Sequence, residues 1–100
     1  MSVTLAGVKD YLRIDGSAED ALLQSFMAAA GAYLAGAIDD YAAKYTDADF
    51  AALADMLALA YIAEAYRNRD TLNDTRGAEK HFSYMFFAQI TALQNWAVSS

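Results

Sequence analysis

Apolar residues recur every three to four positions along almost the whole chain, and this spacing limits what the chain can fold into more than any other feature. A period of 3.6 gathers apolar side chains on one face of an α-helix, whereas a half-buried strand needs strict alternation. Proline is absent, and alternating runs rich in Val, Ile and Thr are missing. The sequence therefore predicts an all-α fold, a compact bundle of about four helices in one domain over residues 1–100.

Capping signals divide the first half of the chain into a short helix and a long one. Thr4 is a suitable N-cap, and Asp15-Gly16 is expected to end the first helix. Ser17, with Asp20 three residues later, is an acidic form of the capping box and predicts a second helix that ends near residues 39–43. The side chains expected to face inward are Leu5, Val8, Leu12, Leu22, Leu23, Phe26, Met27, Ala30, Tyr33, Leu34, Ala37, Ile38 and Tyr41.

Two further helices are predicted in the second half. Thr46 and Asp49 repeat the capping signal for a helix that runs to about Arg69, and its two apolar sides place it in the middle of the bundle. The segment "DTLNDTRG" reads as a polar loop, and a C-terminal helix follows over about residues 78–97. The side chains expected to be buried are Phe50, Leu53, Leu57, Leu59, Tyr61, Ile62, Tyr66, Phe82, Met85, Phe86, Ile90, Leu93 and Trp96.

The composition indicates a chain with more apolar surface than a small monomer hides. Apolar residues make up 57% of the chain and charged ones only 20%, so some apolar surface is expected to meet a partner. A net charge of −6 argues against tight binding to nucleic acid. Asp55 and Glu64 interrupt the most apolar segment, so no membrane span is expected. The first residues lack a basic region followed by an apolar run, so no signal peptide is expected either. The absence of cysteine excludes disulfides and thiolate-ligated zinc.

The side of the second helix opposite its apolar face carries small residues where a surface helix usually carries charges. This side collects Ala21, Gln24, Ser25, Ala28, Ala32, Ala35 and, at its end, Asp39, with Ala29, Gly31 and Gly36 on its flanks. Small side chains let another helix approach closely, which makes Ala28, Ala32 and Ala35 candidate interface residues. The alternative is that alanine is present only as the best helix former. The glycines favour a packing reason, because they weaken a helix.

Other candidate interface residues lie near the ends of the last two helices. Tyr84 and Phe87 fall opposite the apolar face of the C-terminal helix, where they either anchor a partner or pack under the polar loop. Glu64 and Arg67 are spaced for an internal ion pair that can extend to a neighbouring chain. Arg67 and Arg69 beside Tyr66 either complement the helix dipole or form fork-shaped contacts with carboxylates of another subunit.

The sequence offers no active site. His81 is the only histidine, so no pair of histidines is available for zinc, and neither a G-x-S-x-G elbow nor a Gly-rich phosphate loop is present. The acidic pairs lie at helix ends, where capping and the helix dipole account for them. We therefore expect no catalytic, cofactor-binding or metal-binding residues.

The first seventy residues resemble the small head–tail connector proteins of tailed bacteriophages, which are also described as neck adaptors. The resemblance rests on the segment "VTLAGVKDYLRIDGSAEDALLQSFMAAAGAYLAGAI" and on the later segment "ALADMLALAYIAEAYRNRDTL". The elements that match in order are Thr4-Leu5, Val8-Lys9, Leu12-Arg13-Ile14-Asp15, Asp20, Leu22-Leu23, residues 29–34, Tyr66, Asn68 and Arg69.

The resemblance implies a non-enzymatic structural protein of the virion neck, assembled in the host cytoplasm. Such a subunit would form a homo-oligomeric ring under the portal protein, extend the DNA channel without binding DNA specifically, and support the next neck or tail protein. Two other functions remain open: a small helical regulatory module that binds one partner as a dimer, and a magnesium-dependent nucleotide hydrolase. Dimeric stoichiometry would favour the former, and binding of magnesium or nucleotide the latter.

Overall fold

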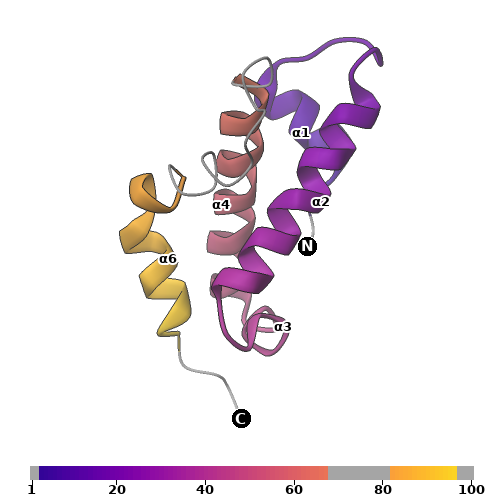
Figure 1. Cartoon of the computed structure of the whole chain (residues 1–100). Coiled ribbons are helices and arrows are strands. Elements are labelled where there is room, and N and C mark those ends of the chain that lie inside the picture. Colours follow the sequence, from indigo (N-terminus) through magenta and orange to yellow (C-terminus); the bar gives the residue numbers. More distant parts are fainter. Residues whose placement is uncertain (1–2, 68–81, 97–100) are drawn as a thin grey trace.

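A computed structural model describes residues 3–67 and 82–96, and the regular structure within these ranges is helical (Figure 1). Two long helices, α2 (Asp20–Ala37) and α4 (Ala48–Arg67), pack against each other. The short helix α1 (Leu5–Leu12) contacts both, and the single turn α3 (Tyr41–Lys44) connects them. Helix α6 (Phe87–Gln94) lies beside α4, on the side away from α1. The predicted all-α fold with two long central helices is confirmed.

The core is formed mainly where α2 faces α4. Leu23 and Leu34 of α2 are fully buried, as are Phe50, Leu57 and Ile62 of α4. Fully burying one such side chain stabilises the fold by about 1.5–3 kcal/mol. Helix α4 buries residues on more than one side because α1, α2 and α6 all pack against it, as its two apolar sides predict.

Helix α1 begins as predicted and ends earlier than predicted. The Thr4 hydroxyl accepts a hydrogen bond from the Gly7 backbone N–H at 3.1 Å. At the other end Arg13 adopts a left-handed conformation with φ of 58°, and the N–H of Ile14 donates to the Lys9 carbonyl at 2.8 Å. This is the Schellman arrangement, so the helix ends at Leu12 and not at Asp15-Gly16.

Helix α2 begins three residues after the predicted position. The prediction of a capping box at Ser17 is wrong, because the Asp20 carboxylate is engaged elsewhere: it accepts from the Lys9 ammonium at 2.8 Å and joins α1 to α2. The predicted cap of the next helix is also displaced. Asp47, not Thr46, caps α4, since its Oδ1 accepts from the N–H groups of Asp49 and Phe50.

The C-terminal helix is interrupted, which changes what it buries. Residues 82–85 are helical, Phe86 leaves the helical conformation (φ −115°, ψ 25°), and α6 follows. The Phe86 ring packs against the Phe82 ring, with centroids 4.6 Å apart. The Met85 side chain faces solvent and is 51% exposed. The predicted burial of Met85 is therefore wrong. Leu53 of α4 is 38% exposed and is therefore less buried than predicted, as is the neighbouring Met56 at 54%.

Candidate functional site

Most of the candidate residues that the structure describes are exposed, while Glu64 and Tyr66 are partly buried. Within residues 3–67 and 82–96, no group of three or more His, Asp or Glu side chains is placed to hold a metal. Over the same ranges, no helix combines the length and the apolar character needed to cross a bilayer. The single histidine, His81, and the candidate Arg69 lie outside the described residues.

The back of α2 is an exposed surface of small, uncharged side chains. All three candidate alanines on this helix are exposed. A Cβ added to Gly31 or Gly36 would meet no atom of the described residues within 4 Å, so no neighbour among residues 3–67 and 82–96 requires the absence of a side chain there. Glycine in a helix interior is nevertheless less stable than alanine by about 0.5–1 kcal/mol. We call this the small-residue surface, and its members are Ala21, Gln24, Ser25, Ala28, Ala32, Ala35 and Gly36.

A second exposed surface is large and apolar. Tyr84 is 76% exposed, Phe87 70% and Met85 51%, and we call these three residues the aromatic surface. The loop that precedes them lies outside the described residues, so its predicted contact with Tyr84 and Phe87 stays a prediction. Met85 belongs to this surface although the helical pattern predicts it to be buried, since the break at Phe86 is not visible in the sequence.

Contacts on the inner side of the same segment hold the aromatic surface in place. The ring of Phe82 is buried and meets the rings of Tyr33 and Tyr61 edge-on, with centroids 5.5 and 5.3 Å away. The hydroxyl groups of Tyr33 and Ser83 form a hydrogen bond between α2 and this segment. Tyr84 and Phe87 therefore project from a segment that is anchored on its opposite side.

The far end of α6 is held by polar contacts that the sequence pattern does not reveal. Lys44, only 4% exposed, donates from Nζ to the Gln94 carbonyl at 2.6 Å. The Gln94 side chain both accepts from the Asp39 N–H and donates to the Asp39 carboxylate. The Trp96 indole donates to Asp47 at 3.3 Å. The only available signal for Lys44 is its place in the aromatic stretch "YAAKY".

The environment of Asp47 favours its ionised form. The backbone N–H of Phe50 makes the largest contribution to lowering the pKa of this carboxyl group below its usual value, followed by the Trp96 indole and the N–H of Asp49. Each of these donors stabilises the carboxylate and not the neutral acid. One ionised side chain thus caps α4 and accepts a hydrogen bond from Trp96, the second residue after α6.

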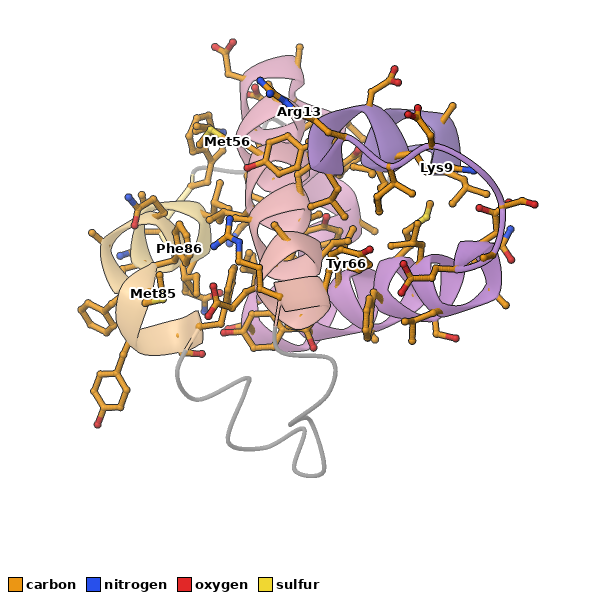
Figure 2. The ribbon with its side chains drawn as sticks, turned by 90° about the horizontal axis from the view of Figure 1, so that it is seen from above. Lys9, Arg13, Met56, Tyr66, Met85 and Phe86 are labelled. Carbon is orange, nitrogen blue, oxygen red and sulfur yellow. The ribbon has the colours of Figure 1, made fainter. Side chains whose placement is uncertain are left out.

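A third group of candidates lies toward the C-terminal end of α4. The Arg67 guanidinium and the Glu64 carboxylate are 3.6 Å apart, so the predicted ion pair between them is confirmed. The Tyr66 hydroxyl donates to Glu19 at 2.7 Å and joins the end of α4 to the residue before α2. Figure 2 shows Tyr66 at this end of α4, away from Met85 on the far side of the bundle. The candidates therefore form three separate groups and not one site.

The comparison with known proteins bears on nearly the whole chain. A family model described as phage gp6-like head-tail connector protein matches residues 2–93. No curated protein and no solved structure gives a significant match. The matched range includes the Thr4 cap, both long helices and nearly all of α6, so it extends beyond the first seventy residues that carry the resemblance. The chain therefore belongs to the phage gp6-like head-tail connector family, whose members are structural, non-enzymatic proteins of the phage neck.

Proposed function

We propose that this connector forms a homo-oligomeric ring that docks under the portal protein, extends the DNA channel and supports attachment of the tail. One observation carries the proposal: the protomer exposes two unlike, uncharged surfaces, the small-residue surface and the aromatic surface. A contact between two different surfaces of identical subunits is heterologous, and it closes into a ring when the rotation between neighbours closes.

The composition of the two surfaces supports a role in assembly. Neither surface, as defined, contains a formal charge, so covering them removes no ionised group from water. The exposed Asp39 continues the back of α2 beyond the end of the helix, and its carboxylate accepts a hydrogen bond from Gln94. Cores of protein interfaces are likewise poor in charged residues and rich in aromatic residues and methionine.

The charge of the chain supports passage of DNA without specific binding. The net charge is −6, and Asp15, Asp39, Asp40 and Asp49 are all exposed. A surface of this sign releases no counterions from a duplex and repels its phosphates. In the proposed arrangement the portal protein lies on one side of the ring and the next neck or tail protein on the other.

Native mass spectrometry and negative-stain electron microscopy test the proposal, with the protein alone and mixed with portal rings. We expect closed rings of more than two copies, formed either in solution or on the portal. A strict monomer that leaves portal rings unbound would refute the proposal. A two-fold dimer with no affinity for portal rings would instead favour the helical regulatory module.

A further inference from the structure

We infer that the aromatic surface of one protomer packs on the small-residue surface of the next copy; this inference rests on the ring proposed above. The two surfaces are complementary in size. At about 200 Å² for a fully exposed side chain of this size, the exposed fractions of Tyr84, Met85 and Phe87 amount to about 400 Å². A patch of this area is as large as the largest apolar patch on a typical monomer, and such patches are often functional.

The small-residue surface has the shape that such a patch requires. Projecting rings can approach a helix closely only where the side chains on that helix are short. The back of α2 carries nothing larger than a methyl group at Ala28, Ala32, Ala35 and Gly36. No described residue fills the space beside Gly31 and Gly36, so this space is open to a neighbouring copy.

The polar atoms of the two surfaces are also compatible. The exposed Tyr84 hydroxyl needs a hydrogen-bonding partner when it is covered. The small-residue surface offers the uncharged amide of Gln24 and the hydroxyl of Ser25, whose own hydrogen is already donated to the Ala21 carbonyl at 3.1 Å. Both side chains retain an acceptor oxygen for a phenol.

The fold prevents the two surfaces of one protomer from meeting each other. Phe82 and Ser83 contact Tyr33 on the inner side of α2, so Tyr84 and Phe87 point away from that contact. The back of α2 likewise points away from α4 and α6, which lie toward the other side of the bundle (Figure 1). A second copy covers both surfaces through one repeated contact, because each copy offers one surface to each of its two neighbours.

Cysteine pairs test this contact, because the natural chain contains no cysteine. Ala32→Cys on the small-residue surface is combined with Ala88→Cys, which adjoins Phe87 and leaves all three aromatic-surface residues intact. Both positions are exposed alanines. The matched control combines Ala88→Cys with Ala52→Cys, an exposed alanine of α4 outside both surfaces. A short bismaleimide is added to the assembly that the parent protein forms, alone or on portal rings, and products are separated under denaturing conditions.

We expect the Ala32/Ala88 pair to give a ladder of dimers, trimers and higher species, and the control pair and each single-cysteine variant to stay monomeric. Dimers from Ala32→Cys alone would show a two-fold contact and overturn the inference, as would a ladder no stronger than the control. In both cases rings seen by microscopy would leave the proposed function standing. If the parent protein forms no assembly, the proposed function and the inference both fail.

A second measurement does not depend on cross-linking. Ala32→Glu places a charge on the small-residue surface and is expected to abolish ring formation, while Ala52→Glu keeps it. Both variants are expected to unfold at the parent's urea midpoint, which separates loss of assembly from loss of folding. Ala32→Glu rings as abundant as those of Ala52→Glu would contradict the inferred contact.

Discussion

Replacing Lys44 tests how α6 is attached to the bundle. Its Nζ donates to the carbonyl of Gln94, the last residue of α6, whose carbonyl has no partner within that helix. Lys44→Met keeps an unbranched stem of similar length and removes only the ammonium group. Lys44→Ala removes the ammonium group together with most of the stem.

The expected magnitudes follow from this geometry. A hydrogen bond that involves a charged group stabilises the fold by about 1.5–3 kcal/mol. Because the buried ammonium group also loses hydration, part of this stabilisation is offset. Lys44→Met should therefore lower the free energy of unfolding by about 1–2 kcal/mol. Lys44→Ala also removes three buried methylene groups, each of which stabilises the fold by about 0.8 kcal/mol. The free energy of unfolding should therefore fall by about 3–4 kcal/mol in this variant. For a domain of this length, the Met variant should melt about 4–16 °C below the parent.

Urea unfolding followed by circular dichroism and by Trp96 fluorescence measures these losses, since Trp96 is the only tryptophan and contacts Asp47 at the same end of the bundle. Lys9→Met is the comparison variant, because Lys9 makes a partly exposed ion pair that contributes less than about 1 kcal/mol. A Lys44→Met variant as stable as the parent would refute a stabilising role of the ammonium. Equal losses for Met and Ala would refute the contribution of the stem.

Three other substitutions probe single contacts. The pKa of Asp47 is lowered in the folded state, so its carboxylate stabilises the fold above the ordinary pKa, and this contribution is lost as pH falls through the folded-state value. Asp47→Asn should therefore be less stable than the parent at pH 7 and lose less stability on acidification below about pH 4. Urea midpoints measured at each pH would show this. Tyr41 buries its hydroxyl without a partner among the described residues, and burial is the main cause that raises its pKa to about 12. Tyr41→Phe should therefore raise the free energy of unfolding by about 1 kcal/mol. A variant that calorimetry shows to be less stable than the parent would contradict this. Tyr66→Phe removes the bond to Glu19 and should lower stability by about 1–2 kcal/mol, with faster hydrogen exchange at the start of α2 and unchanged exchange in α6.

The long helices can be predicted from the sequence because their apolar period is sustained over several turns. The exposed position of Ala28, Ala32 and Ala35 follows from the same period, since a residue opposite a buried face has no neighbour in the bundle. Helix ends are less predictable, because a capping side chain is free to take a tertiary partner instead. Asp20 does so when it pairs with Lys9.

Features that depend on how separate elements meet are not encoded in any local pattern. Met85 and Leu53 have the apolar character and spacing of core residues, but the break at Phe86 and the uncovered strip of α4 leave both exposed. Lys44 is buried only because the end of α6 is brought to it by the rest of the fold. The roles of the alanines and of Tyr84 and Phe87 as an interface between subunits remain predictions.

If the next copy packs on the back of α2 as inferred above, the stability of one molecule and the assembly of the particle make opposite demands on Gly31 and Gly36. Alanine at either position would strengthen α2 without touching any described residue of the same chain, so selection for thermal stability alone would favour alanine at both positions. In a virus population, the plaque count and the melting temperature should therefore rank variants at these two positions in opposite orders.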